Sequence, residues 1–264
     1  AWCVTERAHN LFAMTALQSF NARTGQPIDA PAGQPLIATT PTQLDATVRA
    51  AAAAAPAWAA SDGTARARLL DALATALEAQ RDQLVALADA ETALGAPRLQ
   101  GELDRTAFQL RRFGRMASEG VPFRHVDDPA VAGAPPVGHP AMMRVRVPLG
   151  PVAMFAASNF PFAFSVLGGD TAAALAAGCP VVIKAHNGHL LLANRVFALI
   201  QAVLKAQGLP AGLIGLVQGE GNEIGVQLVR HPAIAAGAFT GSTRGGAALQ
   251  AEASARARPI PFYG

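Results

Sequence analysis

Hydrophobic and polar positions in the first half of the chain recur with the period of helices. Thr42 is placed to cap a helix that continues through an alanine-rich run to Trp58. Leucines at 69, 70, 73, 77, 84 and 87 keep returning to one face, which predicts a second helix. A third helix is expected to begin near Pro97, because proline is favoured in a first turn, and to run towards Gly120. We interpret these apolar stripes as core.

The pattern changes between residues 121 and 147. Residues 127–140 are rich in Pro, Gly and Ala and are expected to form a loop. Residues 142–147 alternate apolar side chains with Arg144 and Arg146, which predicts a half-solvated strand. A β-ribbon that leaves the domain here would serve as an oligomer arm, a hypothesis that rests on this pattern.

From residue 148 onward, short apolar runs alternate with helical stretches. The apolar runs predict strands at 152–157, 180–184, 213–217, 236–239 and 260–263, and the stretches between them predict helices at 163–177, 190–207, 222–229 and 242–255. Strands that are apolar on both faces and alternate with helices are typical of a parallel sheet covered on both sides. We therefore predict an α/β fold, a doubly wound parallel sheet preceded by a helical N-terminal segment.

Composition and charge narrow the class of protein. Of 264 residues, 51% are hydrophobic and 15% charged, enough apolar side chain to build a core, which excludes disorder for most of the chain. The net charge of +3 comes from scattered arginines, with lysine only at Lys184 and Lys205, so no basic run indicates nucleic-acid binding. Apolar runs are interrupted well short of the roughly 18 residues that a membrane span needs, so no membrane partner is expected.

The cysteines and the two ends of the chain indicate the cellular location and the domain boundaries. Cys3 and Cys179 form neither a disulfide framework nor a metal cluster, so we expect no metal and a reducing, cytoplasmic location. Residues 1–13 lack the order of a signal peptide and are expected to lie upstream of the natural start. We expect a helical part at 14–120, a loop and β-ribbon at 121–147, and an α/β core at 148–264 that is cut off in its fifth strand.

Polar and glycine residues gather where four of the predicted strands end. These strand ends are residues 158–161, 184–187, 219–225 and 240–243. In an open parallel sheet, ligands bind beyond the carboxyl ends of the strands. The third and fourth ends open helices with glycine or small hydroxyl residues, which suits a phosphate or pyrophosphate. A plain tight turn explains the glycines at 219, 221 and 225 about as well, and Glu220 and Glu223 would repel a phosphate. Residues 240–243 contain no acidic side chain and form the better anion site.

Single residues at these ends have both a functional and a structural interpretation. Lys184 ends a buried strand and either binds ribose hydroxyls or a phosphate, or extends its ammonium group into solvent. Asn159 offers an amide donor for a carbonyl or an oxyanion, although asparagine is also common in turns. His186 and His189 flank a helix start, where a capping or surface role is expected, and Cys179 is expected to be a small buried residue.

Taken together, the four strand ends resemble those of the aldehyde dehydrogenase superfamily. The resemblance is carried by residues 158–161, Lys184, the glycine-spaced turn at 219–225 and residues 239–243, and it extends from about Met14 to Gly264. Residues 157–161, 168–171 and 182–186 resemble the branch that oxidises α-ketoglutaric semialdehyde (2,5-dioxovalerate). The resemblance implies a Rossmann-like cofactor domain that takes NADP or NAD.

The resemblance also implies roles for individual residues. Asn159 would be the amide that holds the oxyanion, Lys184 would contact the adenosine ribose or its 2′-phosphate, and Ser242 would bind the pyrophosphate. Asn187 stands where NAD-preferring relatives commonly place a carboxylate, so NADP is permitted. The residues expected to bind the cofactor are Lys184, His186, Asn187, Gly221, Gly225, Thr240, Gly241 and Ser242.

The family mechanism needs groups beyond this stretch of sequence. A cysteine attacks the aldehyde, hydride passes to the nicotinamide, and a glutamate activates the water that hydrolyses the thioester. The glutamate would directly follow Gly264 and the cysteine would lie further on, in a separate catalytic domain, so the chain alone is expected to show no turnover and poor solubility. A homo-oligomer is expected of the full-length form. The alternatives are a specificity for a fatty aldehyde or another semialdehyde, or a non-catalytic remnant that binds nucleotide or partner subunits.

Overall fold

A five-stranded parallel sheet forms the centre of the molecule. The structure is a computed structural model and describes residues 15–264, so the predicted leader, Cys3 and Met14 lie outside the described residues. The strands are β5 (Val152–Phe155), β6 (Val181–Lys184), β7 (Ile214–Val217), β8 (Ala236–Phe239) and β9 (Phe262–Tyr263), in the order β7-β6-β5-β8-β9. The chain builds outward from β5 in one direction and then returns to β5 to build in the other. This reversal is the doubly wound topology that the sequence predicts.

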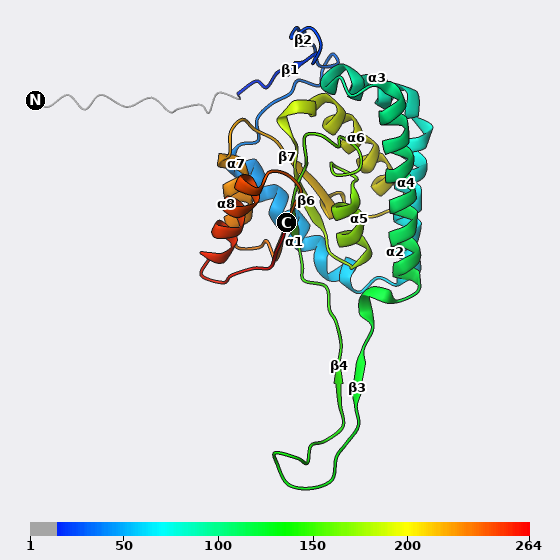
Figure 1. Cartoon of the computed structure of the whole chain (residues 1–264), viewed down its shortest axis with the longest axis vertical. Coiled ribbons are helices and arrows are strands. Elements are labelled where there is room, and N and C mark those ends of the chain that lie inside the picture. Colours follow the sequence, from blue (N-terminus) through cyan, green and yellow to red (C-terminus); the bar gives the residue numbers. More distant parts are fainter. Residues whose placement is uncertain (1–14) are drawn as a thin grey trace, which may run out of the picture.

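Helices cover both faces of the sheet because the strands are apolar on both sides. Along β5, Val152 and Met154 join the core beneath α2 (Gly63–Ala79), α4 (Ala96–Ser118), α5 (Gly169–Ala176) and α6 (Leu190–Ala206). The alternate residues Ala153 and Phe155 join the core on the other face, beneath α1 (Pro41–Ala59), α7 (Glu223–Arg230) and α8 (Thr243–Ser254). Figure 1 shows the two helical layers on opposite sides of the strands.

The helices of the first half are present, with different bounds from those predicted. The first helix is capped by Thr40 rather than Thr42, because Thr40 and Gln43 exchange hydrogen bonds in a capping box and Pro41 occupies the first turn. The predicted second helix is two helices, α2 and α3 (Arg81–Thr92), separated at Gln80. The Gln80 backbone N–H bonds to the Leu77 carbonyl, a tight turn that ends α2 and redirects the chain.

The helix predicted at 163–177 is half as long as expected. It begins at Gly169 because the preceding backbone bonds to other partners: the Glu102 carboxylate of α4 accepts the N–H groups of Phe162 and Ala163. A Cβ atom at Gly168 would lie 2.5 Å from the Ala163 carbonyl oxygen, so this tight approach requires glycine. The result is an irregular turn between β5 and α5.

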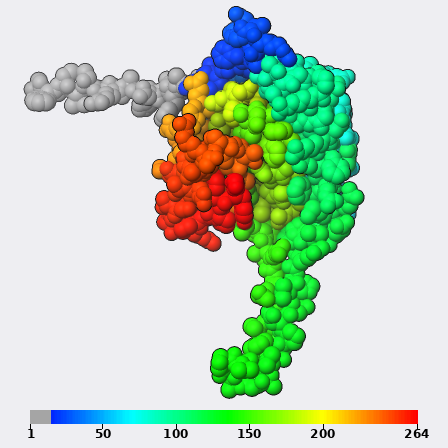
Figure 2. Space-filling view, viewed as in Figure 1, coloured from blue at the N-terminus to red at the C-terminus, as the bar shows by residue number. Residues whose placement is uncertain are grey.

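Two small antiparallel pairs lie outside the central sheet. The pair β1 (Ser19–Phe20) and β2 (Pro27–Ile28) lies against α3, and a short 3₁₀ turn, η1 (Val121–Phe123), leads into the second pair. That second pair, β3 (Val126–Asp128) and β4 (Met142–Arg144), forms a ribbon that projects from the body in Figures 1 and 2. Asp127 and Asp128 are therefore strand, not loop, and the strand at 142–147 is shorter than predicted. It is exposed on both faces rather than half-solvated, because no layer covers the ribbon.

Within residues 15–264, one helical stretch is long and apolar enough, by length and composition alone, to cross a membrane. Residues 187–206, which comprise the 3₁₀ turn η2 (Asn187–His189) and α6, have a mean hydropathy of 1.3. Seven α6 side chains are nevertheless buried, and the helix contacts α2 and α3. We therefore interpret α6 as a core helix, and its apolar composition as a consequence of being covered on several sides.

Candidate functional site

The carboxyl ends of β5, β6 and β8 lie side by side at one edge of the sheet. Phe155, the last residue of β5, is in register with Lys184 on one neighbour and with Phe239 on the other. Asn159, Lys184 and Thr240 therefore emerge at the same edge, where the strand order reverses. The carboxyl end of β7 joins them beside β6, since Lys184 is in register with Val217. This edge is referred to below as the carboxyl edge.

The turn that carries Asn159 is held by hydrogen bonds from other elements. Arg98 of α4 donates to the Asn159 carbonyl oxygen at 2.7 Å, and the buried Glu102 carboxylate accepts from Phe162 and Ala163 at 2.7 and 2.9 Å. His189 Nε2 donates to the Ala157 carbonyl at 2.9 Å. These bonds fix the backbone on both sides of Asn159. The residue itself is exposed, so its side-chain amide remains accessible.

His189 corrects the expectation of a capping or surface residue. It is fully buried, and its Nε2 bond to Ala157 places the proton on that nitrogen and leaves Nδ1 as an acceptor without a partner among the described residues. Burial lowers the pKa of His189, so the neutral ring is favoured. The histidine ties the β6 end to the β5 end from inside the protein and does not line a surface site.

Lys184 lies partly buried at the end of β6, with its ammonium group directed to the next turn. Its Nζ donates to Asn187 Oδ1 at 3.0 Å. Burial lowers its pKa to about 8, because the charged form loses hydration and no carboxylate among the described residues pairs with it. Lys184 and Asn187, two of the predicted cofactor residues, are thus brought together, and an anion beside them would raise the lysine pKa again.

His186 caps the short 3₁₀ turn that follows β6. Its Nδ1 accepts the Gly188 N–H at 3.0 Å, which places the proton on Nε2. Burial, with the nearby His189 and Lys184 as lesser causes, lowers the pKa of His186 to about 4. The ring is neutral at physiological pH and offers one N–H donor next to Lys184.

The glycines after β7 have conformational and packing reasons to be glycine. Gly221 has φ of +64°, a left-handed conformation that favours glycine. A Cβ atom at Gly225 would lie 3.2 Å from the Phe155 ring, so its absence lets α7 approach β5. Their spacing therefore serves the turn and the helix contact. Glu223 in the first turn of α7 bonds to Gln227, which leaves this end less suited to a phosphate than the end of β8.

The end of β8 presents a capped helix of twelve residues. Ser242 caps α8 and accepts the Gly245 N–H at 3.2 Å. A Cβ atom at Gly241 would collide with the Phe239 ring, so glycine is required beside the cap. The backbone N–H groups of Thr243 and Arg244 bond to no described residue and are exposed, as the first N–H groups of a helix are when they await an acceptor.

An acidic residue lies closer to this end than the sequence suggested. Thr240 Oγ1 donates to the Asp170 carboxylate at 3.2 Å, so Asp170, which belongs to α5, supplies the negative charge that residues 240–243 lack. Burial raises the pKa of Asp170. The Thr240 hydroxyl is thereby occupied in tying β8 to α5, which makes Ser242 and the α8 N–H groups the better anion donors.

Sequence reasoning missed two residues at this edge. Arg244 is an exposed cation in the first turn of α8, where the positive end of the helix disfavours it unless an anion is near. That unfavourable placement was a signal that the sequence alone could have supplied. Asp170 has no such signal, because only the fold brings it to Thr240.

The carboxyl edge can hold a dinucleotide through two groups of donors. One comprises the N–H groups and guanidinium at the start of α8, which suit a pyrophosphate. The other comprises Lys184, His186 and Asn187, which offer an ammonium, an imidazole N–H and an amide. Asn159 lies between the two groups because β5 lies between β6 and β8. Within residues 15–264, no group of His, Cys, Asp or Glu is placed to hold a metal ion.

Comparisons with known proteins place the chain in a family. The sequence model of the aldehyde dehydrogenase family matches residues 18–261. Alpha-ketoglutaric semialdehyde dehydrogenase 2 of Azospirillum brasilense is 44% identical over 94% of this chain and 46% of its own length. The alpha-ketoglutaric semialdehyde dehydrogenase of Acinetobacter baylyi is 42% identical over 75% of this chain and 37% of its own.

A solved structure supports the fold. An NADP-dependent enzyme of Escherichia coli superposes with a TM-score of 0.80 at 23% identity, over 94% of this chain and 48% of its own. The chain thus spans less than half the length of each of these three proteins.

Proposed function

The chain belongs to the aldehyde dehydrogenase family, and from that membership we propose that it supplies the dinucleotide-binding part of an NAD(P)-dependent enzyme that oxidises an aldehyde to a carboxylic acid. The observation that carries the proposal is the reversal of strand order at β5. It gathers the Ser242-capped helix, Lys184 and Asn159 at one edge of the sheet, which is where open α/β sheets bind nucleotides.

The donor chemistry at the carboxyl edge suits the proposed cofactor. The start of α8, with Ser242, Arg244 and the unpaired backbone N–H groups, would hold the pyrophosphate. Lys184, Asn187 and the neutral His186 would bind the adenosine ribose, and a 2′-phosphate would meet a cation that pairs with no carboxylate among residues 15–264. When bound, the cofactor supplies the nicotinamide that accepts a hydride from the substrate.

Asn159 is the residue of this chain proposed to contact the reacting group. Its amide donates a hydrogen bond to the oxygen that becomes negative when the aldehyde carbon is attacked, and this charge is better stabilised by a donor that is already in place. Arg98, Glu102 and His189 fix the backbone on both sides of Asn159. The turn therefore needs little rearrangement when the charge develops.

The substrate proposed for the whole protein is a short semialdehyde with a distal carboxylate. The two relatives at 44% and 42% identity are both named alpha-ketoglutaric semialdehyde dehydrogenases, and 2,5-dioxovalerate is that compound. We extend their substrate to this protein as part of the proposal, because both relatives bear the same name and the family match at residues 18–261 includes the Asn159 turn and the carboxyl edge.

The β3–β4 ribbon is proposed as a contact between subunits of a homo-oligomer. It exposes seven large apolar side chains, namely Val126, Val131, Val137, Met142, Met143, Val145 and Val147. Apolar side chains on a segment that no layer covers are typical of a surface buried by a partner.

We also propose a cytoplasmic location, in keeping with the buried free thiol of Cys179.

Titration calorimetry of the chain with NADP⁺ and NAD⁺ tests the proposal. Saturable binding of at least one dinucleotide is expected. The chain has only two lysines, so Lys205→Met is a matched control for Lys184→Met: it removes the same charge from the exposed end of α6. Lys184→Met is expected to weaken NADP⁺ binding about tenfold, the effect of losing one charge-assisted hydrogen bond, and Lys205→Met to leave it unchanged. Absence of binding by both dinucleotides would refute the proposal.

A further inference from the structure

A second concentration of charge lies at the opposite edge of the sheet. A hollow of about 480 Å³ is lined by Arg230, Pro232, Glu252, Ala255, Arg256, Ala257 and Arg258. These residues come from the end of α7, the loop that enters β8, the last turn of α8 and the segment between α8 and β9. Because the strands are parallel, this is the amino end of β8 and β9, away from Ser242 and Lys184 at the carboxyl edge.

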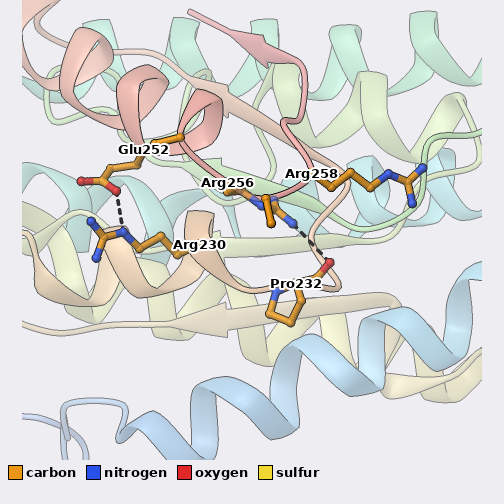
Figure 3. A pocket seen from close by; sticks show the side chains of 7 residues that line it. Arg230, Pro232, Glu252, Arg256 and Arg258 are labelled. Carbon is orange, nitrogen blue, oxygen red and sulfur yellow. Dashed lines mark hydrogen bonds and ion pairs between the residues drawn. The ribbon is translucent and has the colours of Figure 1, made fainter.

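Two of the three arginines have structural partners. Arg230 forms an ion pair with Glu252, and Arg256 donates to the carbonyl oxygens of Val229 and Pro232 at 3.1 and 3.2 Å. Figure 3 shows the ion pair on one side of the hollow and Arg256 directed to Pro232. Arg256 therefore binds carbonyls at the end of α7, a common use of arginine.

Arg258 is exposed and has no such partner. Among residues 15–264, its guanidinium forms no hydrogen bond or ion pair, and Figure 3 shows no interaction between it and the residues drawn. Its charge lies close enough to Arg256 to lower the pKa of that residue, after burial as the larger cause. Two like charges thus share the hollow without a carboxylate between them, and two guanidinium groups offer N–H donors that the protein leaves unused.

The charges around the hollow do not cancel. The hollow is lined by three guanidinium groups and one carboxylate, that of Glu252, and it lies at the C-terminal ends of α7 and α8. Each helix end is equivalent to roughly half a negative charge. About one positive charge is therefore left uncompensated. A small anion that entered the hollow would meet this charge.

We propose that this hollow binds a small phosphate monoester, with the phosphate on Arg256 and Arg258. Guanidinium groups bind phosphate oxygens in pairs, and a phosphate has three acceptor oxygens to share between two arginines. Pro232, Ala255 and Ala257 give the rest of the wall small apolar surface, which suits a compact organic body. The volume lies within the range of roughly 300–1,000 Å³ found for small-molecule sites.

Calorimetric titration of the full chain with glycerol 3-phosphate, at constant ionic strength, tests the site. Saturable binding is expected, and Arg258→Gln should weaken it about tenfold or more, the effect of losing a charge-assisted pair of hydrogen bonds. Arg112→Gln is the matched control: it removes the same charge from an exposed position on α4, in the opposite helical layer. Arg256→Lys, which keeps the charge but loses the paired geometry, should also weaken binding.

Three results would overturn the proposal. In the first, the binding of glycerol 3-phosphate does not saturate. In the second, Arg112→Gln weakens that binding as much as Arg258→Gln does. In the third, succinate binds as tightly as the phosphate ester. The first means that no site exists, the second that charge attraction is diffuse, and the third that the ligand class is wrong. Because the hollow and the carboxyl edge lie at opposite ends of the strands, the binding of NADP⁺ should be unaffected by Arg258→Gln. The two sites are therefore tested independently.

Discussion

The Asn159 turn and the β3–β4 ribbon are both irregular or weakly paired segments, but they differ in how they are bonded to the body of the protein. The turn is tied to its surroundings by a buried carboxylate, an arginine and a buried histidine. The ribbon is held by its own strand pairing and one exposed ion pair, Arg144 with Asp128, and it exposes apolar side chains. Polar side chains inside the body thus fix a site, whereas apolar side chains outside it mark a surface for contact.

The largest effect is expected at Glu91, the carboxylate that joins the N-terminal segment to α6. It is buried and accepts from the Leu191 and Leu192 N–H groups and from Ser19 Oγ. Glu91→Ala should lower the free energy of unfolding by about 3 kcal/mol, because three hydrogen bonds are lost and helix N–H groups are left buried without partners. Urea unfolding measures this, with the exposed Glu119→Ala as control. A loss equal to that of Glu119→Ala would show that buried carboxylates do not hold the body together.

Glu102→Ala should cost less, about 2 kcal/mol, since only two backbone N–H groups lose their acceptor. Its specific effect is faster hydrogen exchange at residues 160–164, because the turn is freed. Glu102→Gln retains one carbonyl oxygen and should keep exchange close to that of the unchanged protein. Unaltered exchange in Glu102→Ala would mean that the turn is not fixed from α4.

The pH dependence of NADP⁺ binding tests whether Lys184 contacts the 2′-phosphate at the carboxyl edge. The pKa of Lys184 is about 8 in the free protein, so the ammonium is charged below that pH and increasingly neutral above it. NADP⁺ affinity should therefore fall between pH 7 and pH 9, while its 2′-phosphate remains dianionic because such phosphates have a second pKa near 6. NAD⁺ affinity, without this phosphate, should change less. Equal pH dependence for the two dinucleotides would place the 2′-phosphate away from Lys184.

The smallest effect on stability is expected in the ribbon. Met143→Ser replaces an exposed side chain and should change the free energy of unfolding by less than about 0.5 kcal/mol. If the ribbon is a subunit contact, the same change should lower the association constant measured by analytical ultracentrifugation. A monomeric chain whose sedimentation is unaffected by Met143→Ser would contradict the role proposed for the ribbon.

Sequence patterns were sufficient for the repeating parts of the fold. The alternation of apolar strands such as 181–184 with helices specifies the parallel sheet, because both faces must be buried. The prediction failed where a long-range contact decides the local structure. Glu102 lies sixty residues from Phe162, and its carboxylate replaces the first half of the expected helix.

In the candidate site, too, the features set by local sequence could be predicted and those set by long-range contacts could not. Ser242 as a helix cap and Lys184 at a strand end could be placed from local sequence, and the structure brings both to one edge. The burial of His189 and the Asp170–Thr240 bond could not, because each depends on which segments the fold brings together. The hollow around Arg258 could not be predicted either, because Arg230 lies far from Arg256 and Arg258 in sequence and the fold brings them together at the amino ends of β8 and β9.

The most direct test of the account is an amide-resolved NMR titration of the chain with NADP⁺. The account predicts saturable shifts concentrated at residues 184–188 and 241–245, the two groups of donors at the carboxyl edge, with smaller shifts around Asn159. Saturable shifts confined to other parts of the chain, or none at these two turns, would contradict the claim that the ends of β6 and β8 hold the dinucleotide.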